Sequence, residues 1–138
     1  MNVAFFLVPK DDVVFVSPEA TMRQALEKLD HHGYTALPII DHRGKYIGTI
    51  TEGDLLRKLK DSPEVSFENT DQIPLSEIPF RKKNKPVPIN ADMEDLISLA
   101  TEQNFVPVVD DNKVFIGIIR RSDVIQYCYD YLKKMEKE

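Results

Sequence analysis

The chain has 138 residues, of which 42% are hydrophobic and 30% are charged, and its formal net charge at pH 7 is −5. These values are ordinary for a globular protein and exclude general disorder. The negative balance argues against broad nucleic-acid binding, which needs clustered positive charge. A single cysteine, Cys128, excludes an intrachain disulfide framework, and the short apolar start at 3–8 resembles neither a signal peptide nor a membrane span. We therefore expect a cytoplasmic protein that binds neither nucleic acid nor membranes.

The first half of the chain predicts five elements. A β-branched and aromatic run indicates an opening strand. Thr21 and Gln24 form a capping-box pattern, and apolar residues then recur at helical spacing until Gly33. Two apolar runs around a turn-rich segment predict a hairpin, and a leucine-rich segment predicts a last helix. In order, we expect a strand at 13–16, a helix ending at Gly33, strands at 37–40 and 46–50, and a helix carrying Leu55, Leu56 and Leu59.

The second half repeats this order in register. Pro107, Gly117 and Asp123 each lie 69 positions after Pro38, Gly48 and Asp54. A fixed offset indicates two copies of one supersecondary unit. The elements expected in the second copy are a strand at 87–89, a helix capped by Asp92, strands at 105–109 and 114–119, and a long helix that opens near Ser122.

These patterns predict an α/β (α+β) fold in which two β-α-β-β-α repeats pack with pseudo-two-fold symmetry. A cleft between the copies would present paired glycines and paired aspartates. The expected boundaries are 1–62 for the first repeat, 63–85 for a polar connector with one helical turn near 75–78, and 86–138 for the second repeat.

Both glycines of the repeat sit inside an apolar strand. Glycine weakens a strand and often marks a place where a ligand approaches the backbone closely. Gly48 and Gly117 are therefore candidate markers of a binding site.

The junction that follows each glycine carries groups suited to a nucleotide. Thr51 ends a strand, and Asp54 lies in the first helical turn after it. A helix N-terminus offers free N–H groups to phosphate, and a carboxylate accepts two hydrogen bonds from a ribose diol. Thr51 and Asp54 equally form a plain helix-capping motif. The second copy keeps Asp123 but has Arg120 at the capping position, which favours the nucleotide interpretation.

The repeated unit resembles a CBS repeat, and the tandem pair resembles a Bateman module, over about residues 10–131. The matching stretches are Pro38-Ile39-Ile40-Asp41, Gly48 to Asp54, Pro107-Val108-Val109-Asp110 and Gly117 to Asp123. The resemblance implies a non-enzymatic regulatory module that binds an adenine nucleotide, such as AMP, ADP, ATP or S-adenosylmethionine, in the cleft between the repeats. A regulated protein would then respond to the change.

Carried over residue by residue, the resemblance implies three kinds of ligand contact. Thr51 would contact phosphate or ribose, and Asp54 and Asp123 would bind ribose. The backbone around Thr35-Ala36 and Phe105-Val106 would lie along adenine. Lys10 and Val14, which flank the first strand, are weaker carry-overs.

Arg120 departs from the pattern of the family, and Arg121 follows it. Two arginines can grip more than one phosphate, and they can equally be a solvated helix start. The phosphate interpretation favours cyclic di-AMP, because the pair resembles stand-alone bacterial members of the family. The basic run at 81–85 is either a solvated loop or a contact for a phosphate tail or an acidic partner.

A further alternative is a protein-interaction module whose nucleotide sites have decayed. We expect no obligatory cofactor, because adenine nucleotide would act as a ligand, and the histidines have no metal-ligand spacing. No nucleophile–base pair or phosphate loop is present, so we expect no enzymatic activity. Tyr127 and Tyr131 lie four residues apart on the last predicted helix and suggest a homodimer.

Overall fold

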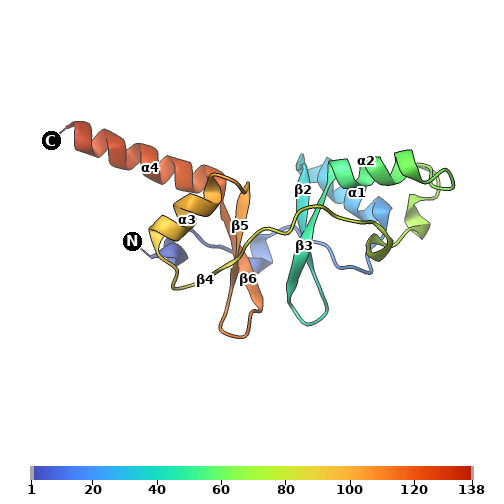
Figure 1. Ribbon diagram of the computed structural model, residues 1–138, viewed down its shortest axis with the longest axis horizontal. Coiled ribbons are helices and arrows are strands. Elements are labelled where there is room, and N and C mark those ends of the chain that lie inside the picture. Colours follow the sequence, from blue (N-terminus) through green and yellow to red (C-terminus); the bar gives the residue numbers. More distant parts are fainter. Residues whose placement is uncertain (1, 138) are drawn as a thin grey trace. The chain divides into compact units, whose positions relative to one another are not determined.

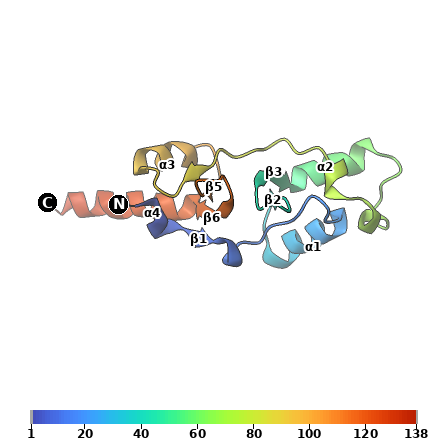
Figure 2. The same ribbon diagram turned by 90° about the horizontal axis from the view of Figure 1, so that it is seen from below.

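The structure is a computed structural model that describes residues 2–137. The chain divides into two compact units, one formed by residues 14–83 and the other by the chain before Val14 together with Asn84 onward. In each unit two helices lie on one side of a β-hairpin (Figures 1 and 2). This mixture of helices and sheets confirms the predicted fold class.

The unit of residues 14–83 is built from α1 (Met22–His32), β2 (Ala36–Ile40), β3 (Tyr46–Thr51) and α2 (Glu52–Asp61). The capping box that opens α1 is confirmed, since Thr21 Oγ1 accepts from the Gln24 N–H and Gln24 Oε1 accepts from the Thr21 N–H. Gly33 ends the helix with φ of 68°, a left-handed conformation that suits glycine. The buried face of α1, which includes Met22, packs with Leu37, Ile50 and Leu55 in one apolar cluster.

The hairpin of β2 and β3 is antiparallel, with Leu37 opposite Ile50. Its turn is held by Asp41 Oδ1, which accepts from the N–H groups of Arg43 and Lys45. The Lys45 N–H lowers the pKa of Asp41, desolvation opposes this shift, and the Arg43 N–H assists it. Asp110 Oδ1 makes the same two bonds in the turn of the other hairpin, so the repeat extends to the turn chemistry.

The strand expected at 13–16 is wrong. Only Val16 pairs, through an isolated parallel bridge to Ile39. The Val13 N–H is used by a turn, where it donates to the Lys10 carbonyl, and Ser17 and Pro18 end the run on the other side. Proline has no N–H to donate to a ladder, so pairing cannot continue through this point.

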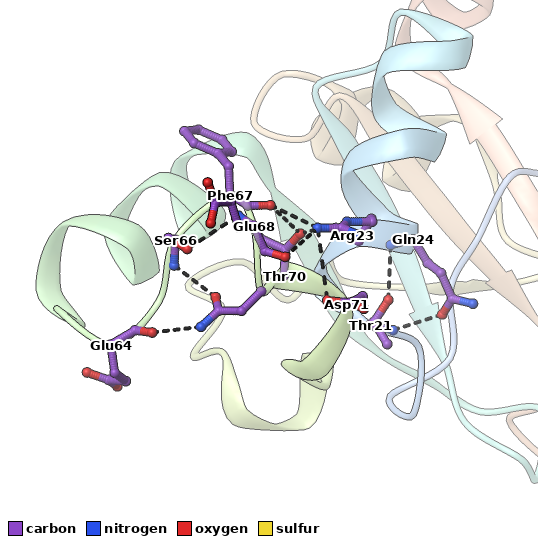
Figure 3. Close-up of polar contacts among 10 residues, drawn as sticks. Thr21, Arg23, Gln24, Glu64, Ser66, Phe67, Glu68, Thr70 and Asp71 are labelled. Carbon is purple, nitrogen blue, oxygen red and sulfur yellow. Dashed lines mark hydrogen bonds and ion pairs between the residues drawn. The ribbon is translucent and has the colours of Figure 1, made fainter.

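The connector after α2 is anchored to α1 by the Arg23 guanidinium (Figure 3). Arg23 Nη2 donates to the carbonyls of Phe67 and Glu68 at 3.0 and 2.9 Å, and Nε donates to Thr70 Oγ1 at 3.1 Å. Asp71 lies at ion-pair distance, 3.9 Å from the same Nη2. The expected helical turn near 75–78 is confirmed as a 3₁₀ turn at Leu75–Glu77.

The other unit holds a four-stranded sheet in the order β1-β6-β5-β4. Only the pair of β4 with β5 is parallel. Asp92 caps α3, as expected, and Cys128 packs against the apolar cluster of this unit. The elements are β1 (Val8–Pro9), β4 (Val87–Pro88), α3 (Met93–Ala100), β5 (Phe105–Val109), β6 (Phe115–Arg120) and α4 (Arg121–Glu136).

Both hairpin glycines are covered by the chain itself. A Cβ on Gly117 would lie 2.2 Å from the Val8 carbonyl oxygen of β1, and one on Gly48 would lie 2.1 Å from the ring of Phe80. The covering segments take equivalent places in the two repeats. Val8 pairs with Ile118, and Lys82 pairs with Thr49, which is the residue 69 positions before Ile118. The close approach that we expected from a ligand is therefore made by protein, and the glycine interpretation is corrected.

Candidate functional site

The junction of β3 and α2 contains a complete capping box. Thr51 Oγ1 accepts from the Asp54 N–H at 3.2 Å, and Asp54 Oδ2 accepts from the Thr51 N–H at 2.9 Å. The Asp54 side chain is only 1% exposed. The capping role that the sequence left open is therefore present.

The second oxygen of Asp54 also has partners. Oδ1 accepts from the Arg57 guanidinium in a short ion pair and from the Arg81 backbone N–H at 3.4 Å. Both oxygens of this carboxylate are thus engaged by its own unit. A ribose diol would have to share them or replace one of these donors.

A cavity of about 370 Å³ adjoins Asp54. Three of its side chains are cationic and three are acidic, so charged groups dominate its wall. The lining residues are Asp54, Arg57, Lys58, Asp61, Ser62, Glu77, Pro79 and Arg81.

The junction of β6 and α4 has different chemistry at the same position of the repeat. Arg120 occupies the N-cap of α4 without a side-chain cap bond. Its Nε donates instead to Asp123 Oδ2 at 2.9 Å, and the Asp123 side chain is 34% exposed. Each aspartate is therefore paired with an arginine, but the arginine comes from three residues after Asp54 and three residues before Asp123.

A cavity of about 440 Å³ adjoins Asp123. Four of its residues lie 69 positions after residues that line the Asp54 cavity, so the two cavities occupy equivalent places in the two repeats. Aromatic side chains of the N-terminal segment and α4 form part of this wall. The lining residues are Phe5, Phe6, Leu7, Val8, Arg120, Asp123, Gln126, Tyr127 and Asp130.

The Arg121 guanidinium closes the end of α3. Its Nε lies 2.9 Å from both the Ala100 and the Gln103 carbonyl oxygens. Helix-terminal carbonyls lack partners within the helix, so this bond satisfies groups that would otherwise need water. Arg121 therefore has a structural role in the α3–β5 connection, beside the phosphate role that stays a prediction.

Replacing Arg121 by alanine is expected to lower the free energy of unfolding by about 1–2 kcal/mol, because a charge-assisted hydrogen bond to two carbonyls is lost. Urea denaturation would measure this change, with Arg120→Ala as the control. Arg120 forms an exposed ion pair, for which the expected loss is about 0–1 kcal/mol. Equal stability of Arg121→Ala and the unmodified protein would contradict the structural role.

The residues expected to lie along adenine belong to the strands β2 and β5 or directly precede them, close to the two junctions. The Thr35 carbonyl accepts from the Glu52 N–H at the start of α2, beside Ala36 of β2. Phe105 and Val106 are buried. The Phe105 carbonyl accepts from the side-chain amide groups of Asn84 and Gln103. Adenine contacts at these positions stay a prediction.

Lys10 and Val14 fall in different units. Lys10 opens a 3₁₀ turn that contacts β6, whereas Val14 packs against the apolar cluster of the unit that starts there. Sequence reasoning did not select Arg57, and it noted Arg81 only as part of a basic run. The signal that could have found Arg57 is its spacing, because a residue three positions after Asp54 lies on the same face of the helix. No local signal in the sequence points Arg81 toward Asp54.

Metal-binding groups and membrane-spanning helices are not found in the described part of the chain. Residues 2–137 contain no group of three or more His, Cys, Asp or Glu side chains arranged to hold a metal ion. Among these same residues, no helix is both long and apolar enough to cross a membrane.

Two segments, 7–61 and 75–130, match the CBS domain family, so the chain belongs to the CBS-domain proteins. A curated relative is the cyclic di-AMP receptor B of Bacillus subtilis, which is 26% identical over 136 residues, covering 99% of this chain and 92% of the relative. The chloroplastic CBS domain-containing protein CBSX1 of Arabidopsis thaliana is 28% identical over 91% of this chain, which spans 63% of the relative.

Solved structures show the same fold. CBSX2 in complex with AMP has a TM-score of 0.73 at 25% identity, over 94% of this chain and 97% of that one. A hypothetical conserved protein from Geobacillus kaustophilus has a TM-score of 0.83 at 25% identity, over 95% and 98% of the two chains. CbpB in complex with cyclic di-AMP is 21% identical, with a TM-score of 0.84 over 99% and 90%.

Proposed function

We propose that this protein is a non-enzymatic sensor of an adenine nucleotide, which binds at the strand-to-helix junctions that carry Asp54 and Asp123. The observation that carries the proposal is the equivalence of the two junctions. Each places an aspartate, an arginine and a helix start beside a cavity of several hundred Å³. Anionic ligands suit the arginines and helix starts, and a ribose diol suits a carboxylate.

The relatives support an adenine ligand of either of two kinds. One solved relative is in complex with AMP, and one curated relative is named a cyclic di-AMP receptor. We propose a ligand with one adenosine group, namely AMP, ADP, ATP or S-adenosylmethionine, as the main hypothesis. Cyclic di-AMP is the alternative, favoured by the relative that spans nearly all of this chain and by Arg120 beside Asp123.

The test is calorimetry with AMP, ADP, ATP, S-adenosylmethionine, NAD and cyclic di-AMP. Asp123→Ala is expected to weaken the ligand that binds this junction by about 1–3 kcal/mol, because a charged acceptor of the ribose is lost. Asp111→Asn, which removes an exposed carboxylate in the β5–β6 turn, is the control and should bind as the unmodified protein does. A chain that binds none of the six compounds would contradict the sensor and favour the interaction module.

We also propose that the sensor acts on a separate regulated protein and forms a homodimer. Exposed apolar side chains on α4, namely Ile125, Tyr129 and Leu132, are available for such contacts. Tyr127 is not equally available, since its ring packs edge-on against Phe6 of its own unit at 5.5 Å. Light scattering at several protein concentrations, with Leu132→Asp as the variant, would test the dimer.

A further inference from the structure

We propose that Arg57 makes the Asp54 junction selective for ligands that carry phosphate, by competing with the ribose of any ligand that does not. This inference rests on the proposed function and deepens it at one of the two junctions. It starts from a difference between the repeats. The arginine that pairs with the aspartate follows Asp54 by three residues in one repeat and precedes Asp123 by three residues in the other.

The guanidinium of Arg57 lies across the start of α2. A Cβ on Gly53 would be 3.3 Å from Arg57 Nη1, so the absence of a side chain at position 53 leaves room for this path. The equivalent positions in the other repeat are Ser122 and Gln126. Gln126 Nε2 donates to Asp130 Oδ1 at 2.9 Å instead of reaching toward Asp123.

Arg57 holds a carboxylate that is almost completely buried, while its own side chain is 31% exposed and lines the Asp54 cavity. The guanidinium therefore contacts Asp54 and at the same time borders the cavity. A short rotation of the side chain would exchange the carboxylate for an anion in the cavity without moving the backbone.

The cavity offers further positive charge for such an anion. Lys58 and Arg81 line it, and within residues 2–137 neither has a carboxylate within 4.0 Å of its charged group. Asp61 and Glu77 also line the wall, and both are exposed. Exposed carboxylates are screened by water and salt more strongly than a buried one, so they oppose a bound phosphate less than Asp54 would.

Ligands with and without phosphate face different costs at this junction. A nucleoside whose ribose bonds to Oδ1 of Asp54 competes with the guanidinium for that oxygen and offers it no anionic acceptor in return. A nucleotide brings a phosphate that can accept hydrogen bonds from the Arg57 guanidinium, in the two-bond geometry that arginine prefers. Arg57 therefore penalises adenosine and favours AMP or cyclic di-AMP. At the Asp123 junction the equivalent position is a glutamine, and the aspartate is paired with Arg120 in an exposed ion pair that water and salt screen, so this selection should be weaker there.

The test compares adenosine, AMP and cyclic di-AMP by calorimetry in an Asp123→Ala background, where the Asp54 junction is the one left intact. Arg57→Gln installs the residue of the other repeat and should narrow the preference for AMP over adenosine by about tenfold, with adenosine binding more tightly than before. Arg57→Lys keeps the charge and should restore part of the preference. Arg43→Gln removes an exposed charge from the turn between β2 and β3, outside the cavity, and should leave the preference unchanged.

Each other outcome has a distinct meaning. An unchanged preference in Arg57→Gln, with AMP still bound, overturns the role of Arg57 and leaves the sensor intact. Binding that is lost entirely in the Asp123→Ala background also overturns the role of Arg57, because it shows that ligand does not use Asp54. Absence of binding by the unmodified protein to all three compounds overturns the sensor and the selectivity together.

Discussion

Gly117→Ala is expected to lower the free energy of unfolding by about 3 kcal/mol, the upper part of the usual range for overpacking a well-filled site. The added methyl group would lie 2.2 Å from the Val8 carbonyl oxygen and 2.7 Å from Leu7 Cδ1. The carbonyl belongs to the backbone of β1, which pairs with β6, and cannot turn away as a side chain can. The strand itself must shift.

Urea denaturation would measure this loss, and Gly48→Ala is the matched control. At Gly48 the obstacle is the ring of Phe80, a side chain that is 37% exposed and can rotate outward. We expect a smaller loss there, and Phe80→Ala should relieve the clash in the double variant. An unfolding midpoint of Gly117→Ala equal to that of the unmodified protein would contradict the packing of β1 on β6.

The same substitution should affect ligand binding at one junction. Leu7 and Val8 line the cavity beside Asp123, so a shift of β1 changes the wall of that cavity. The Asp54 cavity is lined by other segments, and its binding should be spared.

The second large effect is expected from Asp54→Ala, which should lower the free energy of unfolding by about 2–3 kcal/mol. Asp54 is the N3 residue of the capping box, and loss of its bond from the Thr51 N–H, 2.9 Å away, costs about 1 kcal/mol. The loss of the charge-assisted bond from Arg57 adds a similar amount, because the guanidinium keeps some access to water.

Asp123→Ala provides the internal comparison for this prediction. Asp123 lies at the equivalent position, but it makes an exposed ion pair with Arg120 and α4 has no side-chain cap bond. Its loss should cost about 0–1 kcal/mol. Thermal and urea unfolding of both variants would measure the difference, and Asp54→Asn, which keeps an oxygen for Thr51, should fall between them. Equal losses at the two positions would refute the distinction between a buried and an exposed junction.

Local patterns in the sequence predicted the hairpins, the capping box at Thr21, the starts of the helices and the end of α1 at Gly33. These features depend on residues close in the chain, such as Thr21 with Gln24 or Asp41 with Lys45. The strand expected at 13–16 failed because the Val13 N–H is used in a turn and only Val16 pairs with β2. The two-residue strand at Val8–Pro9 had no pattern to predict it, since its pairing comes from β6, more than a hundred residues later.

The candidate site divides in the same way. Thr51, Asp54, Arg120 and Asp123 could be selected because the offset of 69 residues aligns them. The offset alone did not indicate that Arg57 holds Asp54, or that the Arg81 backbone N–H approaches from the connector. Arg121 was selected for phosphate, whereas its Nε bonds to two carbonyls near the end of α3.

The sequence by itself determined that this chain carries two copies of one unit, and that their glycines and aspartates agree while their capping positions differ. The tertiary structure decided what these residues contact. It covers Gly48 with Phe80 and Gly117 with β1, buries Asp54 under Arg57, and leaves Asp123 partly exposed. The reason is physical. A repeat in sequence records which side chains are present, but their burial and pairing depend on segments that are distant in the chain, such as β1 on β6 and the connector on β3.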